Sequence, residues 1–285
     1  MSKNRKHNNS KQAVLDVCIL EAGRFDMLSK CLDALYREAQ TTPLSIYILN
    51  NGVAQDEINS NQELLTYQPD KDPNHGIVDF RVKYSQTNLG FPAGNAELVR
   101  LGKSPLIMFL NDDVELQAGA IEQLLKNMND STVGVVGIKL LFSANSTRQG
   151  YPAGKVQHCG MAVNIRGDVI HPLVGWSADN PKTSVSRDVW AVTGACLTTR
   201  RQLYNQLGGF DKIYGLGTYE DVDYCLKIRQ SGKRVYLDAK AQGHHYTNAS
   251  IEKLKIGFPI QQNRNIFMSR WQNSGQIFWC ENEFW

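Results

Sequence analysis

Residues 14–52 read VLDVCILEAGRFDMLSKCLDALYREAQTTPLSIYILNNG, and this pattern decides the fold class. The apolar run at 14–20 predicts a buried strand that ends in a loop. Residues 26–39 gather their apolar side chains on one helical face, which predicts an amphipathic helix. Residues 44–49 predict a second strand, closed by the turn signal Asn50-Asn51-Gly52. A strand, a helix and a strand in this order predict a parallel pair with a right-handed crossover.

The alternation of strands and helices continues on the C-terminal side. Strands are predicted at 80–84, 106–110, 189–193 and 234–237, and helices at 92–101, 118–128, 200–207 and from 220 onward. This order predicts an α/β fold whose Rossmann-like, mixed but mostly parallel central sheet is flanked by helices. Residues 143–188 are rich in Gly, Ser, Asn and Pro, and we expect them to form long loops around a substrate cleft.

Composition and charge exclude several classes of protein. The formal net charge is +3, from 31 basic and 28 acidic residues that are scattered along the chain, so no nucleic-acid footprint is expected. The six cysteines form no closely spaced pair, which favours buried thiols in a reducing compartment over a zinc site. Residues 1–12 are expected to be a disordered polar tail without a secretory signal. No apolar run approaches the roughly 20 residues of a membrane helix, so we expect a cytoplasmic protein.

An acidic turn follows the apolar strand at 106–110. The sequence there continues with Asn111, Asp112 and Asp113. Charges at the buried end of a strand need a partner, and open α/β sheets bind ligands beyond the carboxyl ends of their strands. Divalent cations take carboxylate and phosphate oxygens, so this turn is a candidate cation site. Asp-rich turns also end strands for local reasons, which is the structural alternative.

Two further clusters can carry chemistry. Residues 219–223, Tyr-Glu-Asp-Val-Asp, open a predicted helix. First-turn carboxylates are favoured by the helix dipole, but three in four residues exceed what capping requires, and one could deprotonate an acceptor hydroxyl. Residues 243–245, Gly-His-His, follow the strand at 234–237. A lone His is usually structural, although imidazole also suits cation sites that mix nitrogen and carboxylate ligands.

The order of these segments resembles glycosyltransferase family 2, the inverting group with the GT-A fold, and most closely its rhamnosyltransferase-like branch. The resemblance covers roughly residues 14–250. The matching segments are NLGFPAGN at 88–95, LNDDV at 110–114, VTGAC at 192–196, GGFD at 208–211, EDVD at 220–223 and the late His244.

The resemblance implies a division of labour along the chain. Residues 13–250 would be the catalytic domain, with a nucleotide-binding half at 13–113 and an acceptor half at 114–250. The implied metal ligands for Mn²⁺ or Mg²⁺ are Asp113 and His244, assisted by Asn111, with His245 as the alternative to His244. The implied nucleotide-binding residues are Leu20, Glu21, Asn50, Asn51, Asn88, Gly90, Gly94, Asn95, Asn111 and Asp112.

The same resemblance implies the chemistry. Asp221 would be the catalytic base and Glu220 would shape the acceptor pocket, with Gly194 and Asp223 also on the acceptor side. The cation would neutralise the leaving nucleoside diphosphate, and one displacement would invert the anomeric carbon. The donor would be a UDP-sugar or dTDP-rhamnose, and the acceptor a saccharide or glycolipid in polysaccharide or glycoconjugate synthesis.

Three positions depart from the family pattern. Asn50 stands where the family usually has Asp, Glu21 opens a loop that is usually small and polar, and Asn111 replaces the first Asp of the metal motif. These changes give weight to a second hypothesis, a catalytically inactive nucleotide-sugar or saccharide binding protein on the same scaffold. The presence of Asp113, Asp221 and His244 together favours the enzyme.

The C-terminal residues 251–285 are rich in aromatic side chains and predict a helical extension. The aromatic residues are Trp271, Phe278, Trp279, Phe284 and Trp285. We expect this extension to pack against the catalytic domain or to form a homodimer. The alternative is a peripheral contact with the inner face of the membrane, because aromatic residues favour membrane interfaces.

Overall fold

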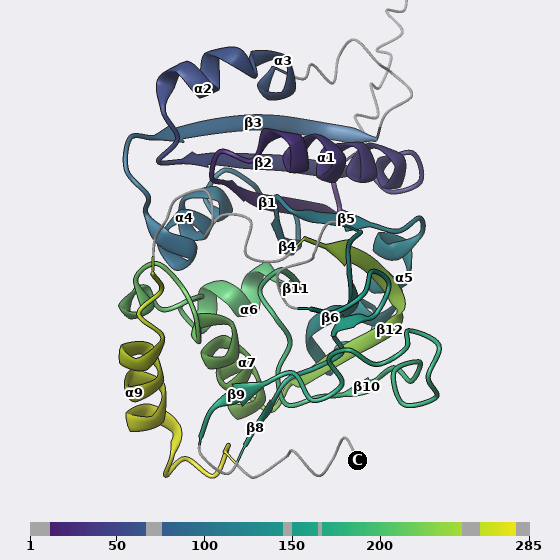
Figure 1. Ribbon diagram of the computed structural model, residues 1–285, viewed down its shortest axis with the longest axis vertical. Coiled ribbons are helices and arrows are strands. Elements are labelled where there is room, and N and C mark those ends of the chain that lie inside the picture. Colours follow the sequence, from purple (N-terminus) through teal and green to yellow (C-terminus); the bar gives the residue numbers. More distant parts are fainter. Residues whose placement is uncertain (1–11, 67–75, 145–149, 165–166, 247–256, 278–285) are drawn as a thin grey trace, which may run out of the picture.

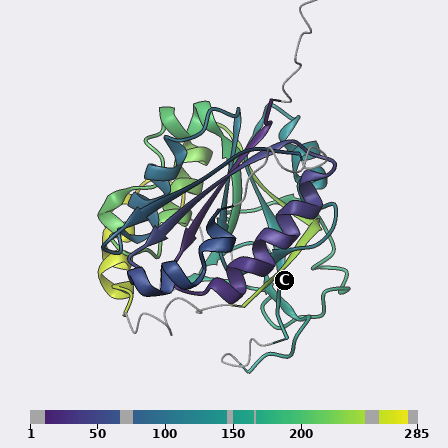
Figure 2. The same ribbon diagram turned by 90° about the horizontal axis from the view of Figure 1, so that it is seen from above.

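One mixed sheet organises the chain in the computed structural model, which describes residues 12–66, 76–144, 150–164, 167–246 and 257–277. In the described part the sheet has 10 strands, ordered β10-β12-β6-β11-β4-β1-β2-β3, with β5 beside β12 and β7 beside β6. Helices cover both of its faces (Figure 1 and Figure 2). The α/β class with a Rossmann-like, mostly parallel centre is confirmed.

The N-terminal half of the sheet is the parallel unit expected from residues 14–52. Strand β1 pairs in parallel with β2 on one side and β4 on the other, and β2 pairs in parallel with β3. The elements are β1 Leu15–Glu21, α1 Phe25–Ala39, β2 Leu44–Asn51, α2 Gln55–Ser60, α3 Gln62–Leu65, β3 Ile77–Ser85, α4 Gly90–Val99 and β4 Leu106–Asn111. The carboxyl ends of β1, β2 and β4 therefore lie at one edge of the sheet.

The second half adds strands of both directions. Strand β11 runs antiparallel between β4 and β6, whereas β12 runs parallel to β6. The elements are β5 Val114–Leu116, α5 Ala120–Met128, β6 Val133–Phe142, β7 Val156–His158, β8 Ala162–Val163, β9 Val169–Ile170, β10 Arg187–Asp188, β11 Cys196–Arg200, α6 Arg201–Gln206, the 3₁₀ helix η3 Lys212–Tyr214, α7 Glu220–Gln230, β12 Arg234–His245 and α9 Ile260–Trp271.

Two expectations for this half were wrong in detail. The apolar residues 189–193 form no strand; Val189, Trp190 and Val192 are buried as an irregular segment that fills the core. The strand expected at 234–237 continues to His245, past a register shift against β6 between Asp238 and Gln242. Such a bulge interrupts the period of two, so the sequence pattern appeared to stop there.

The core lies on both faces of the sheet. One cluster joins α1 and α5 to the strands through fully buried residues such as Leu28, Leu35 and Ile121. The other lies under α4, α6, α7 and α9 and includes Phe109, Trp190 and Phe267. Each fully buried large apolar side chain contributes about 1.5–3 kcal/mol relative to exposure. The helices packed on both faces thus hold the strands in place, so the positions of the strand ends are fixed.

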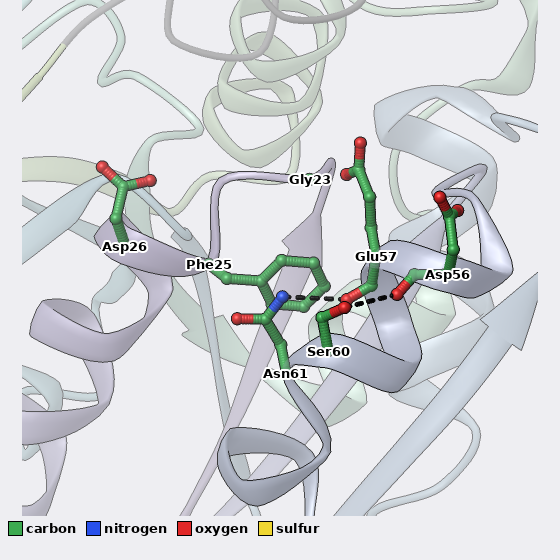
Figure 3. A pocket seen from close by; sticks show the side chains of 7 residues that line it. All are labelled: Gly23, Phe25, Asp26, Asp56, Glu57, Ser60 and Asn61. Carbon is green, nitrogen blue, oxygen red and sulfur yellow. Dashed lines mark hydrogen bonds between the residues drawn. The ribbon is translucent and has the colours of Figure 1, made fainter.

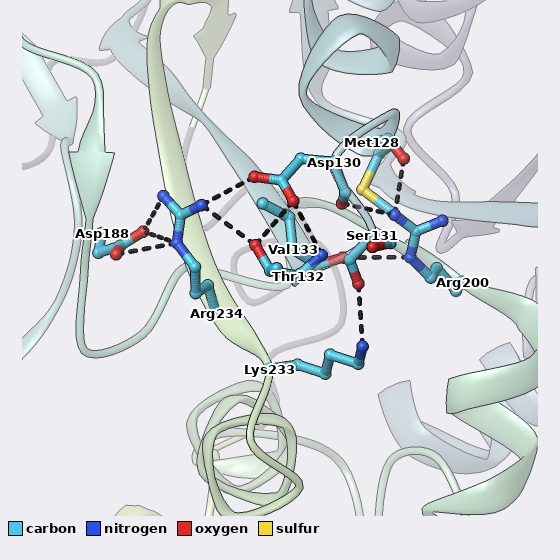
Figure 4. A network of polar contacts seen from close by, with 9 residues as sticks. All are labelled: Met128, Asp130, Ser131, Thr132, Val133, Asp188, Arg200, Lys233 and Arg234. Atoms are coloured by element: carbon cyan, nitrogen blue, oxygen red, sulfur yellow. Dashed lines mark hydrogen bonds and ion pairs between the residues drawn. The ribbon is translucent and has the colours of Figure 1, made fainter.

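A polar network secures the edge of the sheet opposite the acidic turn (Figure 4). Arg234, at the start of β12, pairs with Asp130 at 3.0 Å and with Asp188 at 2.8 Å. Arg200 donates to the carbonyls of Met128 and Asp130 at 2.7 and 2.8 Å. These groups are half-exposed, so their effect is to fix the strand starts more than to add stability.

The C-terminal helix α9 packs against the rest of the chain. Phe267 and Trp271 are buried, and the Trp271 indole donates a hydrogen bond to Asp223 in α7. Phe278, Trp279, Phe284 and Trp285 lie outside the described residues, as do residues 1–11. Within the described part, no helix combines the length and apolarity that crossing a bilayer requires.

Candidate active site

The ladder between β5 and β12 brings Asp113 to a histidine. His245 is paired with Val114, so its side chain lies beside Asp113, the residue just before β5. The Nε2 atom of His245 is 3.1 Å from Oδ1 of Asp113, and both side chains are buried. Within the described residues, Oδ1 of Asp113 has no hydrogen-bond partner. The buried ring nitrogen and the buried carboxylate oxygen therefore meet at ion-pair distance, with no hydrogen-bond donor at that oxygen among the described residues.

Gln157 in β7 orients the His245 ring. Its Oε1 lies 3.2 Å from Nδ1 of His245. Because an amide oxygen only accepts, Nδ1 is the donor in this contact, and the ring is held with Nε2 toward Asp113. Protein ligands of metals are usually oriented by such an outer partner. No sequence motif points to Gln157, since it stands alone within the loop-rich residues 143–188.

His244 makes a different contact. Its Nε2 lies 3.2 Å from Nε2 of Gln117, away from Asp113. Neighbouring side chains on a strand point to opposite faces of the sheet, so only one of the two histidines can face Asp113. The structure gives that place to His245, and we move the expected ligand role from His244 to His245.

Asp112 adds a second buried carboxylate beside Asp113. The backbone N–H of Ala22 donates to its Oδ2 at 3.3 Å. Burial, followed by the charges of Asp113 and Glu21, raises the pKa of Asp112 well above its usual value. Asn111, the last residue of β4, is half-buried, and its backbone N–H bonds to the Ala195 carbonyl. This end of β4 therefore concentrates negative charge that a cation would offset.

Two departures from the family pattern are partners of each other. The amide of Asn50 donates to Oε2 of Glu21 at 2.7 Å, and both side chains are fully buried. The other oxygen of Glu21 accepts the backbone N–H groups of Gly23 and Arg24 and so closes the β1–α1 turn. An Asp at position 50 would place two carboxylates together, so Asn50 is the residue that suits Glu21.

Asn51 and Asn88 build the loop before α4. The Asn51 amide donates to Oδ1 of Asn88 at 3.0 Å and accepts the Leu89 N–H at 2.8 Å. Oδ1 of Asn88 also accepts the Gly90 N–H. Gly90 has a φ of 77°, and a Cβ there would lie 2.1 Å from the carbonyl oxygen of Gly215. These residues fix the loop between β3 and α4 against the segment that leads to α7.

The other two residues singled out in segment 88–95, Gly94 and Asn95, pack inside the fold. Asn95 is buried and donates to the Phe91 carbonyl at 3.0 Å. A Cβ on Gly94 would lie 2.8 Å from a methyl carbon of Leu20, so glycine lets α4 approach β1 closely. Leu20 packs against the core next to it. Leu20, Gly94 and Asn95 thus fix how α4 packs beside β1, and their contact with the nucleotide stays a prediction.

Asp221 is held at the start of α7 by backbone donors. The Gly194 N–H bonds to its Oδ2 and the Val222 N–H to its Oδ1, both at 2.8 Å. Burial raises the pKa of Asp221 above its usual value, although both hydrogen bonds act in the opposite direction. Burial and the Asp221 charge also raise the pKa of neighbouring Glu220, whose Oε2 lacks a hydrogen-bond partner among the described residues. Raised carboxylate pKa values suit proton transfer.

Asp223 has a structural role rather than the expected place on the acceptor side. Its carboxylate is fully buried. Oδ1 accepts from Tyr214 at 3.1 Å, Arg270 at 2.7 Å and Trp271 at 2.8 Å. Oδ2 lies 2.9 Å from Nζ of Lys227. Four surrounding donors leave no room for an acceptor hydroxyl, because Asp223 occupies the inner face of α7.

A pocket of about 350 Å³ opens beside the β1–α1 turn (Figure 3). Its walls come from that turn and from α2. The lining residues are Gly23, Phe25, Asp26, Asp56, Glu57, Ser60 and Asn61. Ser60 and Asn61 bond to backbone carbonyls of α2. The carboxylates in its wall disfavour phosphate and favour uncharged groups with N–H donors.

Solved structures show which class of fold this is. GalNAc-T7 with UDP, GalNAc and Mn²⁺ superposes with a TM-score of 0.62 at 12% identity, covering 83% of this chain and 44% of that chain. The mannosyltransferase PcManGT from Pyrobaculum calidifontis, with GDP-Man and Mn²⁺, gives 0.57 at 12% identity over 91% and 69%. S. aureus TarS 1-349 with UDP-GlcNAc gives 0.53 at 11% identity over 82% and 61%. The fold is that of the GT-A glycosyltransferases.

Sequence comparison defines the family. The model described as "Glycosyltransferase like family 2" matches residues 14–265, and the chain belongs to this family. The O-antigen biosynthesis protein RfbC of Myxococcus xanthus is 32% identical over 168 residues, which are 56% of this chain and 12% of that protein. The uncharacterized protein y4gI of Sinorhizobium fredii (strain NBRC 101917 / NGR234) is 26% identical over 175 residues, 60% of this chain and 18% of that protein. The chain thus spans less than a fifth of either relative.

Proposed function

We propose that this chain is a metal-dependent inverting glycosyltransferase that moves a sugar from a nucleoside diphosphate to an acceptor hydroxyl. The observation that carries the proposal is the meeting of Asp113 and His245 at the strand ends, with Asp221 held at the start of α7. Family membership supports the reaction class.

The residues at the end of β4 fit a divalent cation. His245 Nε2 and Asp113 Oδ1 are buried and 3.1 Å apart, and a nitrogen and a carboxylate oxygen are donors that such a cation accepts. Within the described residues, no three His, Cys, Asp or Glu side chains converge into a complete metal site. We infer that Asp113 and His245 would hold Mn²⁺ or Mg²⁺ together with phosphate oxygens of the donor, with Asn111 and Asp112 beside them. The ion would supply positive charge for the leaving diphosphate.

Asp221 is the proposed general base. Its two backbone hydrogen bonds fix the carboxylate orientation, and its raised pKa strengthens it as a base once it is ionised. Gly194 is essential to this placement, because a Cβ there would lie 3.0 Å from the Phe91 ring. Glu220, buried next to it, would shape the acceptor side. A single base with a good leaving group needs no covalent intermediate, in agreement with inversion.

The names of the relatives support a proposal for the donor and the acceptor. The similar structures were solved with UDP, GDP-Man and UDP-GlcNAc, and one relative is named for O-antigen biosynthesis. We propose a UDP-sugar or dTDP-rhamnose as donor, and a saccharide or glycolipid acceptor in polysaccharide synthesis. The acid-lined pocket beside the β1–α1 turn is close to the expected nucleotide site and would favour a base over a phosphate.

A donor screen tests the proposal. UDP-, GDP- and dTDP-sugars are incubated with Mn²⁺ or Mg²⁺, and release of the nucleoside diphosphate is measured for the wild type, Asp113→Ala and Asp221→Asn. We expect release from one donor class that requires metal and is lost in both variants. Metal-dependent binding without turnover in the wild type would instead support a sugar-nucleotide binding protein, and absence of both binding and turnover would contradict the proposal.

A further inference from the structure

The segment that leads into the catalytic helix is strained. Thr218 and Tyr219 directly precede Glu220 and have φ values of 77° and 71°. Side chains with a Cβ rarely adopt this left-handed region, and a β-branched threonine does so least readily. Within the described residues, these are the only non-glycine positions with positive φ. The surrounding structure must therefore hold this backbone in place.

Asn263 in α9 supplies the contacts that hold it. The side chain is buried, and its Nδ2 lies 2.9 Å from the carbonyl oxygen of Tyr214, 2.7 Å from that of Gly217 and 3.1 Å from that of Thr218. The Thr218 hydroxyl oxygen is 3.2 Å away. Three carbonyl oxygens thus converge on one uncharged amide donor. An acceptor group at the same place would face three negative dipoles.

The helix that carries Asn263 is anchored independently of this segment. Arg270 and Trp271 both bond to the buried Asp223, one turn into α7. Phe267 packs its ring against that of Trp190, with centroids 6.3 Å apart. Asn263 is therefore a donor presented from a fixed helix, not a residue that follows a flexible tail.

The opposite side of the segment is fixed by α4. The Phe91 N–H donates to the Leu216 carbonyl at 3.0 Å. The close approach of Gly90 to Gly215 leaves no space for movement in that direction. Residues 215–219 therefore lie between α4, whose motif the sequence identified, and Asn263, which no motif identified.

We propose that Asn263 is a positioning residue for the transfer reaction: it holds Thr218 and Tyr219 in left-handed conformations and thereby sets the place of Glu220 and Asp221. The inference rests on the proposed function of Asp221 as base. The C-terminal extension is then part of the active-site architecture and more than a packing element.

The experiment compares Asn263→Ala and Asn263→Asp with a matched control, Asn265→Asp. Asn265 is exposed on the same helix and bonds only to Gln261 among the described contacts. We expect kcat to fall at least tenfold in both Asn263 variants while the donor KM stays within about twofold, with the larger fall in Asn263→Asp. The Asn265 variant should retain the wild-type kcat. If Asn263→Asp does not fold, Asn263→Ala, which introduces no charge, decides.

Two further measurements separate positioning from general stability. Hydrogen exchange of the amides of residues 217–223 should accelerate at least tenfold in Asn263→Ala, and this readout needs no activity. Trp271→Phe removes one α9 anchor without touching Asn263, and well below its melting temperature it should keep kcat within twofold. Unchanged exchange in Asn263→Ala, unchanged kcat, or an equal loss of kcat in Trp271→Phe would overturn the inference. A wild type without any transfer would refute the proposed function, while the exchange result would still decide whether Asn263 holds the segment.

Discussion

Replacing Asp223 by asparagine should destabilise the protein more than the same change at Asp221. Asp223 is fully buried and surrounded by Tyr214, Arg270, Trp271 and Lys227. Removing one member of a buried pair costs about 3–5 kcal/mol, because the remaining charge stays uncompensated. Here the Arg270 and Lys227 side chains are 32% and 19% exposed and recover some hydration, so we expect a loss of about 2–3 kcal/mol.

Asp221 differs because burial raises its pKa. The folded state then binds a proton more readily than the unfolded state, so this group opposes folding as the pH rises through its folded-state pKa. At pH 7 the neutral Asp221→Asn is free of this penalty but has one carboxamide oxygen for two backbone N–H donors, so we expect it to lose less stability than Asp223→Asn. Urea unfolding measures the change in the free energy of unfolding of both variants. In a thermal melt, the loss of stability in Asp223→Asn should lower Tm by roughly 5–10 °C. Equal stability of Asp223→Asn and the wild type, or a larger loss in Asp221→Asn, would refute the assignment of one structural and one functional aspartate.

Three other predictions follow from the site. Gln157→Ala should weaken Mn²⁺ binding about 10- to 100-fold by releasing the His245 ring, as measured by electron paramagnetic resonance of free Mn²⁺; unchanged affinity would argue against the orienting role. The acid limb of kcat/KM should lie above the roughly 3.9 of a free aspartate, because Asp221 must be ionised and its pKa is raised; a limb at or below pH 4 would contradict this base. Asn50→Asp should cost about 1–3 kcal/mol in urea unfolding through its contact with Glu21, and Glu21→Gln in the same chain should restore most of it; an additive double variant would disprove the pairing.

The parallel half of the sheet could be predicted because its signals are local. Strands β1, β2 and β4 are largely apolar runs that end in a polar turn, β3 alternates apolar and polar residues, and α1 has one apolar face. The later half was harder to predict. Strand β6, Val133–Phe142, is buried along its whole length, so it shows no alternation, and the bulge in β12 hides its continuation to His245.

The sequence allowed us to predict which residues carry the chemistry of the candidate site, but not which residues contact one another there. Asp113 and Asp221 stand in motifs, and the structure gives each a setting that suits its expected role. The choice between the two adjacent histidines depends on which of them lies on the face of β12 that points to Asp113. The bulge in β12 changes which residues face each side, so the alternation before the bulge does not show this. Gln157 and Asn263 act through contacts more than 40 residues away in the chain, for which a single sequence carries no signal.

The most direct test of the account is the dependence of nucleotide binding on metal, because it requires no knowledge of the acceptor. UDP, GDP and dTDP are titrated by calorimetry with and without Mn²⁺ into the wild type, Asp113→Ala, His245→Ala and His244→Ala. We expect that one nucleoside diphosphate binds only with Mn²⁺, that Asp113→Ala and His245→Ala lose this binding, and that His244→Ala keeps it. Binding that ignores the metal, or that is lost in His244→Ala and kept in His245→Ala, would contradict it.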